Sequence, residues 1–173
     1  MSHVAPAVAL RTIAAGYPTE RQWQEMADLE MTLFFPHRAE NRLETFRAEV
    51  RQRGQHFLYI EHPRTGQSLG YCLYGVSGIS AQIVKLAVHP QWHRRGYGRA
   101  LLRTAMNSIR GSGQIMSIQL HVETTREEAL LLYRSEGFVV DAPVESYYGY
   151  DSAKRVPPTD AALLRALQAS GVL

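Results

Sequence analysis

The stretch HRRGYGRALL, residues 93–102, decides the fold expected of this chain. The apolar run 83–88 leads into it and is typical of a buried strand, and the amphipathic run 99–109 leads out of it and indicates a helix. Gly96 and Gly98 let a loop backbone turn tightly and approach a ligand, because neither carries a Cβ atom. The helix that follows directs unpaired backbone N–H groups and the positive end of its dipole at the same place. Together with the arginines of the stretch, this pattern predicts a site for a pyrophosphate.

The loop alone is compatible with two interpretations. An ordinary strand–loop–helix connection with solvated arginines would contain the same residues, and a lone Gly-x-Gly with basic neighbours does not separate the two. The stretch lacks the Gly-Lys-Ser/Thr ending of the phosphate loop of nucleotide triphosphatases. It also lacks the third glycine of a dinucleotide-binding fingerprint. These two kinds of phosphate site are therefore excluded.

A second stretch, LHVETTREEALLLYRSEGF at residues 120–138, favours the phosphate-binding interpretation. Together the two stretches resemble the cofactor motifs of the GNAT acetyltransferase superfamily, in order and in separation. The first is similar to the superfamily's Gln/Arg-x-x-Gly-x-Gly/Ala loop, and the second to its Asn-x-x-Ala-x-x-x-Tyr-x-x-x-Gly-Phe helix. The resemblance implies a single GNAT N-acetyltransferase domain at residues 8–173, after a flexible segment at residues 1–7.

Hydrophobic periodicity and turn residues predict the order of the elements. Strands are expected at residues 8–14, 56–61, 68–76, 83–88, 117–122, 138–141 and 147–153, and helices at residues 19–35, 41–52, 99–109, 125–135 and 161–169. Thr19 with Gln22, and Thr125 with Glu128, are each expected to form a capping box at a helix start. The expected fold is the α/β GNAT fold. A mixed, mostly antiparallel sheet of about seven strands is flanked by helices, with an extra C-terminal helix.

The composition fits a globular domain that binds an anion. The chain has 173 residues, enough for one domain with a core, and a formal net charge of +3. It contains no dense run of lysine and arginine, so nucleic acid is not an expected partner. Cys72 is the single cysteine, which excludes an intramolecular disulfide and suits a reducing compartment. We expect a cytoplasmic protein without a membrane partner, because the sequence shows no signal peptide and no apolar run of membrane-spanning length.

The resemblance implies that the cofactor is acetyl-CoA. Coenzyme A carries a pyrophosphate and a ribose phosphate, which suits a basic loop. By the resemblance, backbone groups at the end of the strand at 83–88 contact the pantetheine arm and face the thioester oxygen. The residues implied in cofactor binding are Leu86, Ala87, Val88, His93, Arg94, Arg95, Gly96, Tyr97, Gly98, Arg99, Arg126 and Tyr133. No metal is expected.

Acetyl transfer from a thioester to an amine needs a neutral amine, stabilisation of the carbonyl oxygen and a proton for the departing thiolate. Tyr133 stands where the superfamily places a tyrosine near the coenzyme sulfur, and a phenol can donate that proton. His121 interrupts an apolar strand, and an imidazole can accept a proton from an amine near neutral pH. A core tyrosine and a satisfied strand histidine are the structural alternatives. The resemblance favours His121 as base and Tyr133 as acid.

Three segments resemble the N-terminal protein acetyltransferases, in particular catalytic subunits of the NatE type. They are LFFPH at residues 33–37, LHV at residues 120–122, and the pair Tyr147-Tyr148 followed by a Pro-x-Asp-Ala segment from Pro158. In that group the Phe-Pro loop and the tyrosine pair wall the peptide slot, and the histidine is catalytic. The residues implied in acceptor binding are Phe35, Pro36, Val84, Tyr147 and Tyr148. The resemblance therefore implies acetylation of the α-amino group of protein or peptide N-termini.

The chain departs from these patterns at several positions. His93 stands where the loop usually begins with Gln or Arg, and Arg126 stands where the helix usually begins with Asn. Gln82 occupies the place of a second catalytic tyrosine of the NatE type and cannot act as a base. His121 would then act alone or through water. One weak base suits a chain α-amino group, with a pKa of about 7.7–8.0, better than lysine with a pKa of about 10.4.

Two other functions stay open. A small-molecule amine acetyltransferase, acting on a polyamine, an amino sugar or a drug, would keep the coenzyme site and change the acceptor pocket. Its scattered acidic candidates are Glu30, Glu40 and Glu44. A non-catalytic coenzyme-A-binding partner module is kept open by Gln82 and Arg126. The preferred N-terminal residues, lysine acetylation, a homodimer and an auxiliary subunit are not decided by the sequence.

Overall fold

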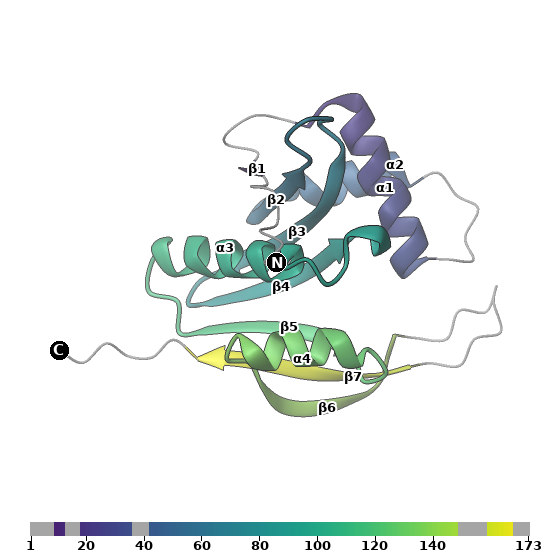
Figure 1. The fold of residues 1–173 in the computed structure, drawn as a ribbon. Coiled ribbons are helices and arrows are strands. Elements are labelled where there is room, and N and C mark those ends of the chain that lie inside the picture. Colours follow the sequence, from purple (N-terminus) through teal and green to yellow (C-terminus); the bar gives the residue numbers. More distant parts are fainter. Residues whose placement is uncertain (1–8, 13–17, 36–41, 149–158, 168–173) are drawn as a thin grey trace, which may run out of the picture. The chain divides into compact units, whose positions relative to one another are not determined.

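The structure is a computed structural model that describes residues 9–12, 18–35, 42–148 and 159–167 (Figure 1). The segment predicted to be flexible, residues 1–7, lies outside these ranges. The chain divides into two compact units. Unit 1 comprises Met1–Gly75 and Lys85–Ala105, and unit 2 comprises Val76–Val84 and Met106–Leu173. None of the helices within the described ranges is both long and apolar enough to cross a membrane.

The strands of unit 1 follow one another in the sequence. They are β1 (Ala9–Thr12), β2 (Gln55–Glu61), β3 (Ser68–Ser77) as far as Gly75, and the second half of β4 (Ser80–Val88). β1, β2 and β3 pair antiparallel, with Leu10 opposite Ile60 and Leu58 opposite Cys72, and β4 is the next neighbour of β3. The Cys72 thiol is fully buried, and burial raises its pKa to about 12. Cys72 is therefore a structural residue rather than a nucleophile.

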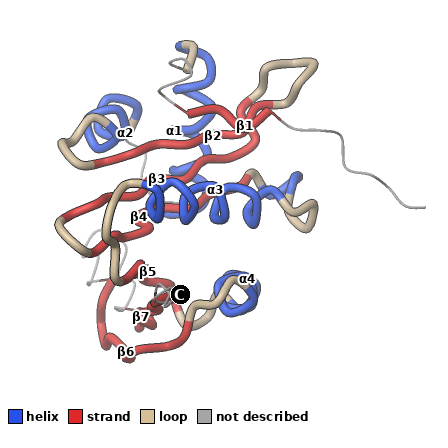
Figure 2. The backbone as a smooth tube through the Cα atoms, turned by 90° about the vertical axis from the view of Figure 1, so that its left-hand side faces the viewer, coloured by secondary structure: helices blue, strands red, loops and turns tan. Residues whose placement is uncertain are grey.

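Two helices lie side by side in unit 1 (Figures 1 and 2). Helix α1 (Glu20–Phe34) begins at the predicted capping box. There the Gln22 N–H donates to Thr19 Oγ1 at 3.2 Å, and the Thr19 N–H donates to Gln22 Oε1 at 2.8 Å. Helix α2 (Leu43–Val50) is shorter at both ends than the prediction of residues 41–52.

Aromatic side chains from both helices and from β2 and β3 form the core of unit 1. Trp23 of α1 stacks on Phe57 of β2 with the ring centroids 5.6 Å apart, and the Phe46 ring of α2 lies 5.0 Å from the Tyr71 ring of β3. All four side chains are buried. This packing holds α1 and α2 against the strands, and it thereby positions the residues where α1 ends and α2 begins.

Gly70 of β3 marks a close approach to the end of β4. A Cβ atom at Gly70 would lie 2.4 Å from the carbonyl oxygen of Ala87 and 3.0 Å from Val88 Cα. Gly70→Ala is expected to lower the free energy of unfolding by about 1–3 kcal/mol, because one backbone must move. Gly75→Ala is the matched control in the same strand, since its Cβ would meet only the flexible Gln55 side chain, at 3.3 Å. Urea denaturation measures the free energy of unfolding of both variants. Equal values would show that the β4 backbone moves away from the added methyl group without loss of stability.

Unit 2 combines parallel and antiparallel pairing. The first half of β4 pairs parallel to β5 (Ser117–Glu123), β5 pairs antiparallel to β7 (Thr159–Leu167), and β7 pairs antiparallel to β6 (Val139–Tyr148). Helix α4 (Glu127–Ser135) lies along one face of β5, β6 and β7 (Figures 1 and 2). Helix α3 (Tyr97–Gly111) starts in unit 1 and ends in unit 2. The pairing within the units is mixed and mostly antiparallel, as predicted.

The extra C-terminal helix predicted at residues 161–169 is wrong. Residues 161–167 belong to β7, which pairs with β5 along one side and with β6 along the other. The alanine and leucine residues of this run prefer a helix by at most about 0.7 kcal/mol per residue, and strand neighbours on both sides outweigh that preference. The closing strands predicted at 138–141 and 147–153 are also revised. One strand, β6, covers residues 139–148, and residues 149–153 lie outside the described ranges.

Candidate functional site

The basic loop, defined as residues 93–98, lies between β4 and α3 in unit 1, and its last two residues are the first two of α3. Arg94 and Gly96 have φ angles of 60° and 83°, which places both in the left-handed region. Glycine adopts this conformation readily, whereas a non-glycine residue there stores backbone strain of the kind that concentrates at ligand sites. The Ala100 N–H donates to the Gly96 carbonyl at 2.9 Å, which closes the first turn of α3. The first backbone amides of an α-helix have no partner within the helix and point toward the place where an anion binds.

His93 ties the basic loop to the end of β4. Its Nε2 atom lies 2.7 Å from the carbonyl oxygen of Val88, so Nε2 carries a proton and donates this hydrogen bond. The histidine that replaces the usual Gln or Arg therefore joins the loop to the strand through its side chain. The contact holds together two elements that the sequence predicts to bind one cofactor.

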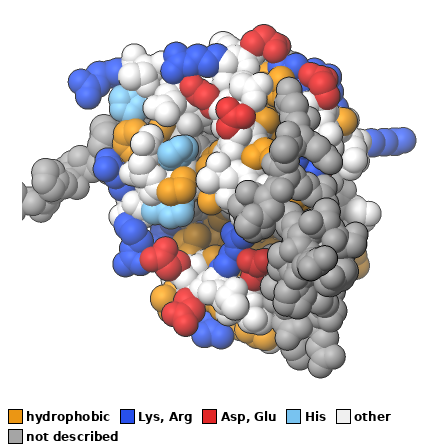
Figure 3. Space-filling model, turned by 90° about the vertical axis from the view of Figure 1, so that its right-hand side faces the viewer, with side chains coloured by type: hydrophobic (Ala, Val, Ile, Leu, Met, Phe, Trp, Pro, Cys, Tyr) orange, Lys and Arg blue, Asp and Glu red, His pale blue; other side chains and the backbone are white. Residues whose placement is uncertain are grey.

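Trp92, which the sequence analysis did not identify, supports the basic loop. It is half-buried at the end of a short 3₁₀ helix (Pro90–Trp92), and the Arg95 guanidinium lies 4.8 Å from the centroid of its ring. The Tyr97 ring lies 6.2 Å from Trp92 and the His62 ring lies 5.6 Å from it. Figure 3 shows a face where histidine and hydrophobic side chains gather beside lysine and arginine. The signal in the sequence is an aromatic residue directly before a glycine-containing basic loop.

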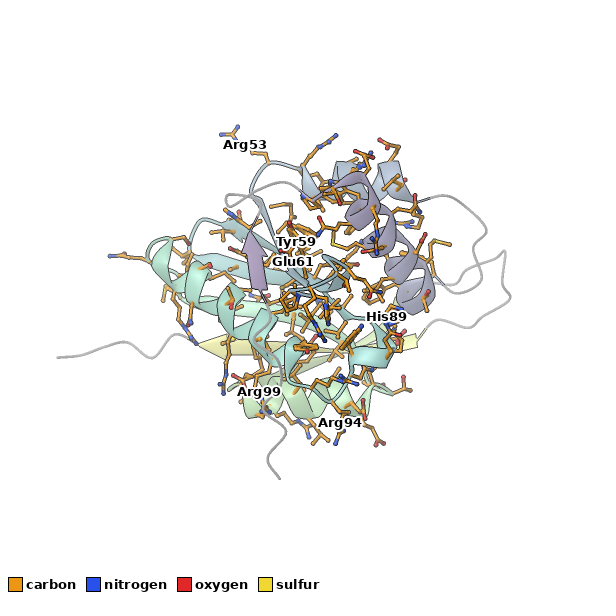
Figure 4. All side chains as sticks on the ribbon, turned by 45° about the horizontal axis from the view of Figure 1, so that its top comes forward. Arg53, Tyr59, Glu61, His89, Arg94 and Arg99 are labelled. Atoms are coloured by element: carbon orange, nitrogen blue, oxygen red, sulfur yellow. The ribbon has the colours of Figure 1, made fainter. Side chains whose placement is uncertain are left out.

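The charged side chains of the basic loop and of its neighbours in the sequence are all positive. Arg94, Arg95 and Arg99 are exposed, and residues 86–103 contain no aspartate or glutamate. Arg94 and Arg99 project from the loop and from the first turn of α3 toward the lower edge of Figure 4. The positive end of the α3 dipole adds to this potential. The loop therefore fits a pyrophosphate, because it combines helix-terminal amides, positive charge and a strained backbone at one place.

The residues predicted to contact a pantetheine arm form the end of β4. Ala87 is buried, and Leu86 and Val88 are half-buried. The His89 N–H donates to the Leu69 carbonyl at 2.9 Å, which fixes the end of the strand against β3. In the part of β4 that belongs to unit 2, Val84 is 40% exposed. That exposure leaves Val84 accessible to a ligand, as a residue of an acceptor site must be.

His121 occupies the half-buried face of β5 in unit 2. Leu120 and Val122, on either side of it, are buried, whereas Gln119 and Glu123 share its face and are half-buried. Burial lowers the pKa of His121 below its ordinary value, because desolvation disfavours the imidazolium. The imidazole is therefore neutral at neutral pH and can accept a proton.

Tyr133 is a buried residue of α4. Its side chain is 8% exposed and packs edge-on against Phe138, with the ring centroids 5.9 Å apart. The Phe138 N–H donates to the Tyr133 carbonyl at 3.0 Å. Gly137 allows this reversal with a φ angle of 90°, the left-handed conformation in which many helices end. The ring thus has the packing of a core residue, and its predicted role as an acid depends on its hydroxyl.

Arg126 forms the start of α4. Its Nε atom lies 2.6 Å from Glu123 Oε2, so an ion pair joins the end of β5 to the beginning of the helix. The capping box predicted for Thr125 and Glu128 is wrong, because α4 is capped at Arg126 without a side-chain hydrogen bond. The arginine that replaces the usual Asn therefore has a structural partner in Glu123. The signal in the sequence is the pair of opposite charges three residues apart.

The residues predicted to bind the acceptor are only partly described. Phe35 follows α1 and is half-buried, with the Arg42 guanidinium 4.0 Å from the centroid of its ring. Pro36 lies outside the described residues. The backbones of Tyr147 and Tyr148 belong to β6, where Tyr148 pairs with Thr159. The positions of their side chains are not among those that the structure describes. The peptide slot stays a prediction.

Residues 52–140 match the family model for the acetyltransferase (GNAT) domain. The chain belongs to the GNAT acetyltransferase family. The match covers both stretches that suggested the family from the sequence, the basic loop with α3 and β5 with α4. The predicted cofactor, acetyl-CoA, is the cofactor of this family.

Two relatives agree with this assignment, and one solved structure shares the fold. It is 30% identical over 167 residues to the N-alpha-acetyltransferase RimI of Mycobacterium tuberculosis, a match that covers 88% of this chain and 91% of that protein. It is 27% identical over 95 residues to the ribosomal protein bS18-alanine N-acetyltransferase of Escherichia coli, which covers 55% of this chain and 64% of that enzyme. Arabidopsis thaliana NAA60, solved with a bisubstrate analogue, shares the fold with a TM-score of 0.75 at 15% identity, covering 94% of this chain and 100% of that one. The predicted resemblance to N-terminal acetyltransferases is confirmed by these relatives.

Proposed function

We propose that this protein is an acetyl-CoA-dependent N-acetyltransferase that acetylates the α-amino group of protein or peptide N-termini. The observation that carries the proposal is His121, a half-buried histidine on β5 whose pKa is lowered by burial. A neutral imidazole suits a chain α-amino group, which loses its own proton at a pH of about 8. The names of the two relatives, an N-alpha-acetyltransferase and an alanine N-acetyltransferase, support this acceptor.

Unit 1 supplies most of the residues proposed to hold acetyl-CoA, which brings an acetyl group activated as a thioester. The amides of the first turn of α3 and the arginines Arg94, Arg95 and Arg99 would bind the pyrophosphate. His93 would keep the basic loop against the carbonyl of Val88. Positive charge and pre-formed loop geometry together reduce the ordering cost of binding.

Unit 2 supplies the residues proposed to move protons. Amide formation releases one proton from the acceptor nitrogen as the N–C bond forms, and neutral His121 accepts it. The C–S bond of the thioester breaks in the same transfer, and the Tyr133 hydroxyl donates a proton to the departing sulfur. Gln82, which is exposed on β4, takes no proton in this scheme. The scheme therefore needs one base and one acid.

The small-molecule alternative is less well supported, because the acidic side chains that would attract a polyamine have partners. The Glu30 carboxylate is fully buried and contacts the Lys85 ammonium, and Glu44 pairs with Arg47 at 3.0 Å. Glu40 lies outside the described residues. The two described candidates are therefore already paired and give no specific support to a polyamine acceptor.

The proposal is tested by acetyl transfer to short peptides with free or blocked N-termini, with spermidine in parallel. We expect transfer to free N-termini that vanishes when the N-terminus is blocked, and the rates would rank the preferred first residues. Transfer to spermidine alone, or only to a lysine of a blocked peptide, would replace the proposed acceptor. Coenzyme binding without transfer to any amine would favour the non-catalytic alternative.

A further inference from the structure

Unit 1 contains a cluster of ionised side chains that the proposed chemistry does not use. The acceptor network, as we call it, consists of Glu30, Arg42, Glu49 and Lys85. The Lys85 ammonium contacts the carboxylates of both Glu30 and Glu49. Arg42 Nη2 lies 3.1 Å from Glu49 Oε1 and 3.9 Å from Glu30 Oε1. The Glu30 side chain is fully buried and the Arg42 side chain is 10% exposed, so the network lies within the unit.

Burial makes this network a poor device for stability alone. The fully buried Glu30 carboxylate loses its hydration, whereas Lys85 and Glu49 stay 17% and 28% exposed, and apolar residues of similar size are often equally stable at a buried position. The two carboxylates also influence Tyr71 of β3. Burial raises the pKa of Tyr71 well above its ordinary value, and the charges of Glu30 and Glu49 raise it further. In some proteins a buried cluster of this kind specifies one geometry rather than adding stability.

The network joins elements that lie far apart in the sequence. Glu30 is on α1, Arg42 precedes α2, Glu49 is on α2, and Lys85 is on β4 directly before Leu86. The Arg42 guanidinium also stacks over the Phe35 ring at 4.0 Å. One set of contacts thus runs from the strand predicted to bind the cofactor to the aromatic residue predicted to bind the acceptor.

We propose that the acceptor network is a positioning device for acceptor binding, in which Glu30, Glu49 and Lys85 orient Arg42 and Arg42 holds the Phe35 ring in place. This inference rests on the proposed function, because it assumes that Phe35 contacts the acceptor peptide. None of the four charged residues touches a reacting atom in it. Their effect is transmitted through the planar guanidinium on the ring, a contact that lysine cannot reproduce.

Arg42→Lys tests the inference because it keeps the positive charge beside Glu49 and removes the planar stack. We expect the KM for the best acceptor peptide to rise about fivefold, with kcat and the Kd for acetyl-CoA unchanged. Glu30→Gln is expected to raise the same KM about tenfold, because Lys85 and Arg42 then share one carboxylate and Arg42 shifts. Thermal denaturation of each variant checks that it is folded.

Arg47→Lys is the matched control. Arg47 is also on α2, pairs with Glu20 and Glu44, and lies 5.7 Å from the centroid of the Trp23 ring. Arg47 thus resembles Arg42 in its ion pairs and in its aromatic neighbour, but that neighbour is Trp23 rather than Phe35. The KM of Arg47→Lys for the acceptor peptide should therefore equal that of the wild-type protein.

Three outcomes would overturn the inference or its basis. An unchanged acceptor KM in folded Arg42→Lys and Glu30→Gln would show that the network is merely structural. An equal rise in Arg47→Lys would show that the effect is not specific to Phe35. Absence of peptide acetylation by the wild-type protein would instead defeat the proposed function, and the inference with it.

Discussion

His121→Ala is expected to lower kcat for peptide acetylation by about 10²–10⁴-fold, the usual contribution of a positioned general base. His121 is the residue on the half-buried face of β5 that is neutral at neutral pH and able to accept a proton. The Kd for acetyl-CoA should not change, because His121 is not among the residues proposed to bind it. Single-turnover kinetics and calorimetric titration with coenzyme A separate the two effects.

Gln119→Ala is the matched control for this prediction. Gln119 shares the strand, the face and the degree of burial of His121 but carries no basic group. It should therefore retain nearly full kcat. If His121→Ala also retained full activity, His121 would be a structural residue. The proton released by the acceptor amine would then pass to water rather than to a side chain at position 121.

The pH dependence of kcat/KM follows from the direction of the His121 pKa shift. Burial lowers this pKa below its ordinary value of 6.5, so the base is lost only as the pH falls below 6.5. The acceptor amine loses activity already below about pH 8, because its protonated form cannot attack. The wild-type rate should thus fall with a slope of one between these values and a slope of two below the His121 pKa. His121→Ala should show a slope of one throughout, and identical profiles would rule out His121 as the base.

The start of a helix is predicted correctly from the sequence where residues close together in the chain decide it. The capping box of Thr19 and Gln22 opens α1 as predicted, because both hydrogen bonds lie within four residues of the chain. The same reasoning failed for Thr125 and Glu128. There the ion pair between Glu123 and Arg126 joins the end of β5 to the helix, and α4 starts after Arg126.

Long-range pairing explains the largest error. The residues of β7 have a helical preference, but β5 and β6 flank them on both sides, and the paired residues lie 11 to 50 positions away in the sequence. The same limit applies to the candidate site. The sequence predicted only that His121 interrupts an apolar strand, and the structure places it on the opposite face from Leu120 and Val122. The hydrogen bond from His93 to Val88 and the left-handed backbone at Arg94 were not predicted, because no local pattern in the sequence specifies either.

Gly98→Glu is expected to raise the Kd for coenzyme A by at least about 100-fold, because a carboxylate would stand in the first turn of α3 where the pyrophosphate is proposed to bind. The helix itself should not suffer, since a negative charge at a helix N-terminus is favourable and glycine is a poor helix former. Gly111→Glu, which places the same side chain at the other end of α3 with nothing within 4 Å of its Cβ, is the control and should bind normally. Gly98→Ala separates the effect of volume from the effect of charge. Calorimetric titration measures all three, and an undiminished affinity in Gly98→Glu would place the pyrophosphate away from the basic loop.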